Sequence, residues 1–181
     1  MNNPLFPRAI ADLVERYHDQ RDSYKSAAYK EAQLREEFIN PFWWELGWDM
    51  TNRGGLAEAY KEVIHEDSLR IEGAIKAPDY TFRVGSEKKF FLEVKAPKVN
   101  VAKDVAPAYQ LKRYSWSAGL AVSLLSDFEE FAVYQTTSVP KPNDAPFKDR
   151  IELFTFEQYE EKWPWLVETF SRDAVWKGRF D

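Results

Sequence analysis

Two acidic residues and a lysine are spaced so that they could carry out hydrolytic chemistry. Asp79 begins one β-like segment, and Glu93 and Lys95 stand at the end of the next. Successive side chains of a strand point to opposite faces, so we expect Glu93 and Lys95 on one face. A turn at residues 85–87 would fold the two segments into an antiparallel hairpin. That hairpin would bring Asp79 close to Glu93 and Lys95.

Two carboxylates placed this close repel each other unless a cation lies between them. Mg²⁺ is a hard ion that takes oxygen ligands and often keeps bound waters. A Mg²⁺ ion can activate a water and offset charge on a phosphate, and a neighbouring lysine can stabilise the charge that develops. The residue types therefore suit phosphodiester hydrolysis.

A surface hairpin with a cross-strand Glu–Lys pair is the alternative interpretation of the same residues. The neighbours of Glu93 are apolar, however, and they are Phe90, Phe91, Leu92 and Val94. This composition predicts a central strand, where a polar side chain without a partner is unfavourable. Burial therefore favours the hydrolytic interpretation.

Charge is distributed unevenly along the 181 residues, whose formal total is −5. Residues 83–113 carry eight basic and three acidic side chains, whereas residues 1–82 and 126–181 each carry a net charge of −5. A local basic patch can bind phosphate whatever the total charge is, although lysines on a solvated face are the ordinary alternative. The mild overall acidity argues against a protein that coats nucleic acid by bulk charge.

Length and composition indicate one folded domain, with 44 % apolar and 16 % aromatic residues. The sequence contains no signal peptide and no apolar run near twenty residues, which argues against a membrane span. Cysteine is absent, which excludes disulfides, thiolate zinc sites and cysteine nucleophiles and fits a reducing cytoplasm.

Periodicity predicts alternating helices and strands. Helices are expected over residues 8–25, 29–46, 56–67, 103–118 and 156–170, with a further helix capped by Ser171. Strands are expected over residues 79–84, 89–95, 120–125, 131–135 and 151–154. Pro41 predicts a kink or break in the second helix, Gly47 its end, and residues 138–149 a proline-rich loop.

Two further pairs of residues lie four apart on predicted helices. Gln110 and Tyr114 share one face of the helix over 103–118, and Glu31 and Arg35 share one face of the helix over 29–46. Spacing alone fits an ordinary amphipathic helix and a surface ion pair.

Taken together, these residues resemble the PD-(D/E)xK nuclease superfamily. The resemblance rests on Pro78-Asp79, Glu93-Val94-Lys95 and Gln110-x-x-x-Tyr114 in this order. Within the superfamily, residues 31–49 (EAQLREEFINPFWWELGWD) are similar to the first helix of nuclease domains in type I restriction subunits and type IIG restriction–modification enzymes. That helix reads roughly E-x-x-x-R-x-x-(F/L)-I-(D/N)-P-x-x-x-x-L-G-W-D, and Asn40 stands where most relatives have Asp.

The resemblance implies an α/β fold with a restriction-endonuclease-like core, in which helices flank a mixed central β-sheet. It implies a Mg²⁺-dependent, site-specific DNA endonuclease of type IIG, in which Mn²⁺ can replace Mg²⁺. Asp79, Glu93 and Glu31 would bind the metal, Lys95 would act on the water, and Gln110 would support the site. The residues expected to contact DNA are Lys98, Lys112, Arg113 and Tyr114.

The resemblance also implies an organisation and a set of partners. Residues 1–137 would form the nuclease core, and residues 138–181 would lead toward a helical connector and an adenine-N6 methyltransferase outside this chain. The expected partners are double-stranded DNA, methyltransferase and target-recognition regions of the same polypeptide or complex, and a second copy in a transient dimer on DNA, all in a prokaryotic cytoplasm. Two alternatives stay open: a non-catalytic nucleic-acid-binding or scaffold module, and a repair-type nuclease acting on RNA or branched DNA.

Overall fold

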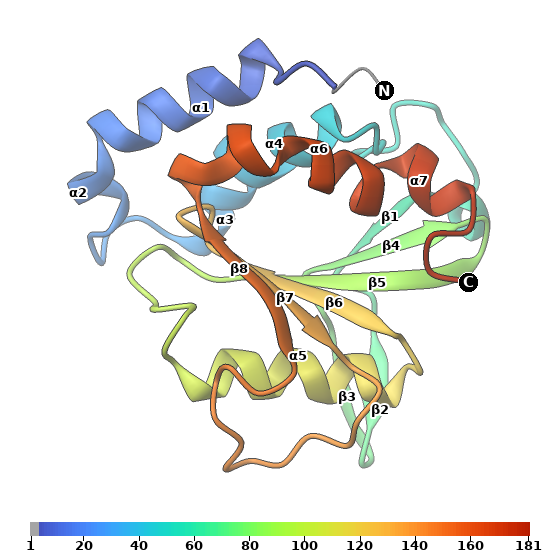
Figure 1. Cartoon of the computed structure of the whole chain (residues 1–181). Helices are drawn as coiled ribbons and strands as arrows, with labels where there is room; N and C mark the ends of the chain where they lie inside the picture. Colours follow the sequence, from blue (N-terminus) through green and yellow to red (C-terminus); the bar gives the residue numbers. More distant parts are fainter. Residues whose placement is uncertain (1–3) are drawn as a thin grey trace.

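Six strands form one mixed sheet at the centre of the protein (Figure 1). The computed structural model describes residues 4–181. The strands, in their order across the sheet, are β1 (Val63–His65), β4 (Tyr80–Val84), β5 (Glu87–Val94), β6 (Val122–Ser126), β7 (Glu130–Gln135) and β8 (Arg150–Thr155). Strands β5 and β6 pair in parallel, and the other neighbours pair antiparallel.

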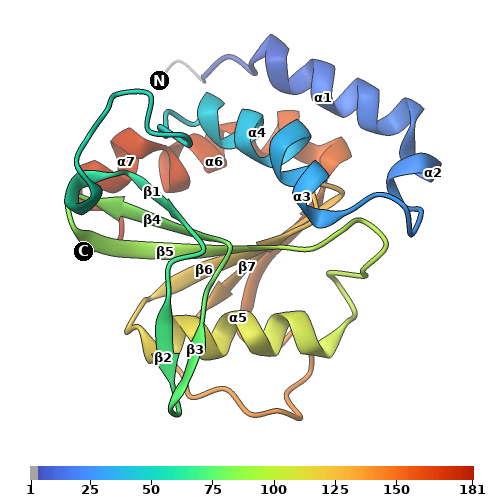
Figure 2. The same ribbon diagram turned by 180° about the vertical axis from the view of Figure 1, so that it is seen from behind.

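Helices cover both faces of this sheet (Figures 1 and 2). Helix α5 (Val105–Ser117) joins the parallel strands β5 and β6 and covers one face. The other face carries α1 (Arg8–Asp19), α3 (Glu31–Leu34), the π-helical turn η1 (Arg35–Ile39), α4 (Asn40–Glu45), α6 (Tyr159–Phe170) and α7 (Arg172–Trp176). Short helices α2 (Arg21–Tyr24), η2 (Glu58–Tyr60) and η3 (Phe156–Gln158) lie in the connections. The expected α/β class with a mixed sheet flanked by helices is confirmed.

Alternation along β5 sends its side chains into two separate cores. Phe90, Leu92 and Val94 belong to the aromatic core beneath α1, α4 and α6. Phe91 belongs to the smaller core beneath α5, together with Leu111. Because side chains two residues apart share a face, the residue two positions after Phe91, which is Glu93, lies on the α5 side of the sheet.

Most of the predicted elements are confirmed. The hairpin is formed by β4 and β5, Gly47 ends its helix with φ +93°, and the Ser171 hydroxyl accepts a hydrogen bond from the backbone N–H of Ala174 (3.1 Å). Pro41 causes no break. Proline lacks an N–H and crowds the preceding turn, and the helix accommodates it with the wider π-helical turn over residues 35–39.

The predicted helix over residues 56–67 is wrong. Only the single turn η2 forms there, and strand β1 follows it, pairing Val63 with Phe82 and His65 with Tyr80. Pairing with β4 outweighs the weak local helical pattern. A second two-stranded sheet, β2 (Leu69–Ile71) and β3 (Ala74–Lys76), also lies where no strand was predicted.

The C-terminal segment is part of the same fold. Strand β8 pairs with β7, and Trp163 and Phe170 of α6 are buried in the aromatic core with Phe42. The structure therefore shows no break in packing at residue 137. Within residues 4–181, none of the helices combines the length and apolar character needed to cross a membrane.

Candidate active site

The β4–β5 hairpin holds Asp79 against Glu93. Tyr80 pairs with Leu92, so the next positions, Asp79 and Glu93, face each other at the end of the pairing. The backbone N–H of Asp79 donates a hydrogen bond to Glu93 Oε1 (2.9 Å), and the backbone N–H of Val94 donates to Asp79 Oδ2 (2.7 Å). Each carboxylate is thus fixed by the backbone of the opposite strand.

Burial makes the charged forms of these carboxylates unfavourable. Glu93 is 2 % exposed, and burial, followed by repulsion from Asp79, raises its pKa to about 8. Burial also raises the pKa of Asp79. The pKa of Glu31, at the first position of α3, is raised by burial and then by the charge of Asp79. The three carboxyl groups therefore share one site that favours an added positive charge.

The donor set fits a hard divalent cation held by few protein ligands. Within residues 4–181, no three acidic or histidine side chains form a complete metal cage. Mg²⁺ is usually bound by one or two carboxylates, with waters and substrate phosphates completing its octahedral shell. Asp79 and Glu93 each use one carboxylate oxygen for a backbone N–H, which leaves the other oxygen of each for such an ion.

Lys95 extends β5 toward the same carboxylates. Its backbone N–H donates to the carbonyl of Ser126 (3.1 Å), which continues the parallel pairing of β5 with β6 beyond Val94. The charge of Lys95 lowers the pKa of both Glu93 and Glu31, against the larger effect of burial. The structure therefore brings together Glu31, Asp79, Glu93 and Lys95.

Arg35 is a site residue that the sequence analysis did not identify. Its side chain is 15 % exposed, and its guanidinium lies 4.6 Å from the centre of the Tyr80 ring. It donates to the backbone carbonyl of Asp79 (3.2 Å) and lies 3.8 Å from Asp79 Oδ1. The alternative of a surface ion pair with Glu31 is wrong, because the salt-bridge partners of Arg35 within residues 4–181 are Asp79 and Glu66.

Helix α5 supplies Gln110 and Tyr114 from the adjacent layer. Gln110 Nε2 donates to the Tyr114 hydroxyl (2.8 Å). Burial raises the pKa of Tyr114, and the charges of Glu93 and Asp79 raise it further. Tyr114 is only 6 % exposed, so it lies beside the carboxylates rather than on the surface of the helix.

The residues expected to contact DNA fall in different environments. Lys112 is 2 % exposed, donates to the carbonyl of Lys148 (3.2 Å) and lies 3.9 Å from Asp144. Its ammonium is buried under the loop between β7 and β8, so this arrangement does not favour the expected contact of Lys112 with DNA. Lys98 is exposed in the loop after β5, and Arg113 is half-buried.

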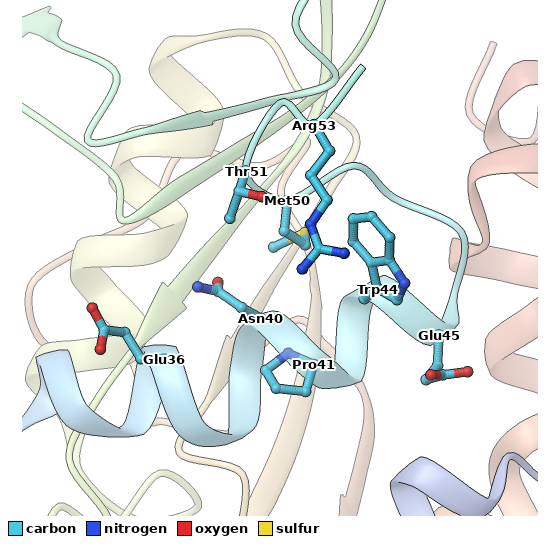
Figure 3. A pocket seen from close by; sticks show the side chains of 8 residues that line it. All are labelled: Glu36, Asn40, Pro41, Trp44, Glu45, Met50, Thr51 and Arg53. Atoms are coloured by element: carbon cyan, nitrogen blue, oxygen red, sulfur yellow. The ribbon is translucent and has the colours of Figure 1, made fainter. Parts of the chain in front are cut away.

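A pocket of about 490 Å³ lies between η1–α4 and the loop that follows (Figure 3). In this pocket the guanidinium of Arg53 lies 4.5 Å from the centre of the Trp44 ring. Asn40 lines the pocket and accepts a hydrogen bond from the Tyr80 hydroxyl (2.7 Å). Asn40 thus supports the Tyr80 ring on which Arg35 stacks. The candidate metal ligands Asp79, Glu93 and Glu31 do not line this pocket.

One comparison with known proteins gives a clear match. The chain is 39 % identical over 171 residues to the type II restriction enzyme and methyltransferase RM.Eco57I of Escherichia coli. No family model matches the chain, and no solved structure matches it. The alignment covers 93 % of this chain and 17 % of the relative, so the chain is similar to about a sixth of a protein that is both a restriction enzyme and a methyltransferase.

Proposed function

We propose that this chain is a Mg²⁺-dependent DNA endonuclease domain of a restriction enzyme, with a PD-(D/E)xK site. The observation that carries the proposal is the juxtaposition of Asp79 and Glu93, fixed by each other's strands, with Lys95 beside them. The similarity to RM.Eco57I supports the restriction-enzyme part of the proposal. The mixed sheet, with the site at the end of its parallel strand β5, supports a restriction-endonuclease-like fold.

Each site residue has a role that follows from its position. Asp79 and Glu93 would hold the ion, with Glu31 as a further ligand directly or through water. When bound, Mg²⁺ would supply an activated water and offset charge on the phosphate. The Lys95 ammonium would donate to that water or to the phosphate oxygens, stabilising the negative charge that develops. Arg35 holds the backbone at Asp79 in place.

The proposed substrate is double-stranded DNA in the cytoplasm of a prokaryote. Cutting both strands in one encounter needs two nuclease sites, so we propose a transient dimer on DNA. By analogy with RM.Eco57I, methyltransferase and target-recognition regions would belong to the same polypeptide, as in type IIG enzymes. Lys98, Arg113 and Tyr114 are the residues proposed to contact DNA near the site.

Cleavage of duplex DNA tests the proposal, using the polypeptide that carries this domain with its target-recognition region. Lys95→Ala should lower the Mg²⁺-dependent rate by roughly 100-fold or more, the usual effect of removing one donor to a developing charge. Lys103→Ala is the matched control, because Lys103 is an exposed lysine in the loop between β5 and α5. Equal rates for the parent and Lys95→Ala would overturn the assignment.

A non-catalytic nucleic-acid-binding module is the second candidate, because the carboxylates do not form a complete metal cage within residues 4–181. A calorimetric titration with Mn²⁺ distinguishes the nuclease site from the non-catalytic module. A nuclease site should give binding heat that Asp79→Asn and Glu93→Gln each abolish. An absence of any response that depends on Asp79 and Glu93 would favour the module.

A further inference from the structure

The β2–β3 hairpin is a two-stranded ribbon inserted between β1 and β4. Leu69 pairs with Lys76 and Ile71 with Ala74, and the ribbon ends three residues before Asp79. Figures 1 and 2 show that it extends away from the six-stranded sheet alongside α5. It is therefore an arm joined directly to the candidate site.

One face of this ribbon is anchored and the other is exposed. Ile71 is 4 % exposed and packs in the α5 core with Leu111. On the opposite face, Arg70 pairs across the strands with Ile75, which is 66 % exposed. The turn is tight, with positive φ at Glu72 and Gly73, as in the two-residue turns that match strand twist. The ribbon thus presents a formed surface.

On this ribbon and in the residues just before it, the acidic side chains form salt bridges within residues 4–181 and the basic side chains do not. Each acidic side chain of residues 66–76 forms a salt bridge with a basic side chain from another element. The pairs are Glu66 with Arg35 (3.5 Å), Asp67 with Lys88 (2.9 Å) and Glu72 with Arg113 (2.5 Å). Arg70 and Lys76 form no salt bridge within the part of the chain that the structure describes. Both are exposed, so the ribbon presents two unpaired positive charges.

The width of the ribbon determines which groove of a DNA duplex can accept it. Neighbouring strands lie about 4.7–4.9 Å apart, and their side chains add to this width. The major groove of B-DNA, about 12 Å wide, accepts a two-stranded ribbon, whereas the minor groove is about 6 Å wide. Basic side chains beside such a ribbon reach phosphates, and apolar ones reach base edges.

We propose, resting on the nuclease function proposed above, that the β2–β3 hairpin enters the major groove of duplex DNA beside the phosphate to be cut. Arg70 and Lys76 contact phosphates, and Ile75 faces the base edges. Ile75 lies beside Arg70 on the exposed face, and Lys76 is exposed at the end of β3 on the other face. The two unpaired charges, the exposed Ile75 and the short connection to Asp79 point to this occupant.

Salt dependence of duplex binding tests the proposal. The parent chain, Arg70→Ala/Lys76→Ala and the control Lys177→Ala/Arg179→Ala are compared by fluorescence anisotropy with a labelled duplex, without divalent ions. The control removes one lysine and one arginine that are both exposed and lie near the C-terminus. Losing two phosphate contacts should make the slope of log K against log[salt] shallower by about 1.8. Arg70→Lys/Lys76→Arg should retain the parent slope, because both charges remain.

Methylation of guanine N7 by dimethyl sulfate reports on the major groove. At saturating protein concentration, the parent should protect guanines beside the site from methylation. With Ile75→Gly, the same guanines should be methylated. The hairpin proposal would be overturned if Arg70→Ala/Lys76→Ala showed the same salt slope as the parent, or if the bound parent protected no guanine from methylation. Neither result would affect the proposed nuclease function. Equal cleavage rates for the parent and Lys95→Ala would instead overturn the proposed nuclease function.

Discussion

Replacing Glu93 with Gln should stabilise the metal-free protein at neutral and alkaline pH. The amide has nearly the same shape, and its oxygen can still accept the hydrogen bond from the backbone N–H of Asp79. What the substitution removes is a carboxyl group that is 2 % exposed and faces Asp79 and Glu31. The change therefore tests charge rather than packing.

The magnitude follows from the pKa of Glu93, which burial raises from 4.5 to about 8. A group whose pKa is raised in the folded state contributes its stability fully below pH 4.5 and loses it as pH rises toward 8. Each pKa unit corresponds to about 1.4 kcal/mol, so the free energy of unfolding should fall by about 4–5 kcal/mol across this window. Glu93→Gln lacks this group and should not show that part of the fall.

Urea unfolding at pH 5, 7 and 9 without divalent ions measures the effect. The difference in unfolding free energy between Glu93→Gln and the parent should increase with pH by several kcal/mol, and mostly below pH 8. Glu87→Gln is the matched control, because Glu87 lies on the same strand with its side chain 73 % exposed. A difference that does not change with pH would refute the argument that Glu93 is a buried, repelled carboxyl group.

Three further predictions concern stability and binding. Thr81→Val should raise the unfolding free energy by about 1 kcal/mol in urea unfolding, because the buried Thr81 hydroxyl has no hydrogen-bond partner; a loss of stability would contradict this. Mg²⁺ at 100 times its Kd should raise the parent's unfolding free energy by about 2.7 kcal/mol, and Asp79→Asn should abolish the gain, as read by thermal shift; an equal gain in both would count against the site. Lys112→Ala should destabilise the fold by about 1–3 kcal/mol yet leave duplex affinity unchanged in anisotropy, since Lys112 is buried; weakened DNA binding without destabilisation would restore its expected role.

Much of the candidate site can be predicted from local sequence patterns. Alternation along the strand and one turn were enough to predict that Asp79, Glu93 and Lys95 meet, because adjacent strands of a hairpin are placed by short-range geometry. Glu31 came from the resemblance, since its spacing from Arg35 fits a surface pair equally well. The structure places Glu31 beside Asp79, which lies far along the sequence.

What could not be predicted depends on tertiary contacts. Arg35 turns inward because Tyr80 and the backbone of Asp79 give its guanidinium a stacking surface and an acceptor. Lys112 is buried because the loop after β7 folds over α5, which helical spacing does not report. The β2–β3 ribbon is short and mixed in polarity, so its pattern predicts no strand, and Ile71 is held by packing on α5.

Whether the carboxylate site hydrolyses DNA is tested by the Mg²⁺-dependent cleavage rate of duplex DNA by the Glu93→Gln polypeptide, with Glu87→Gln as the control. Glu93→Gln should be folded and at least as stable as the parent at neutral pH, yet it should cut roughly 100-fold or more slowly, whereas Glu87→Gln should cut at the parent rate. Cleavage by Glu93→Gln at the parent rate would contradict the claim that this carboxylate site hydrolyses DNA.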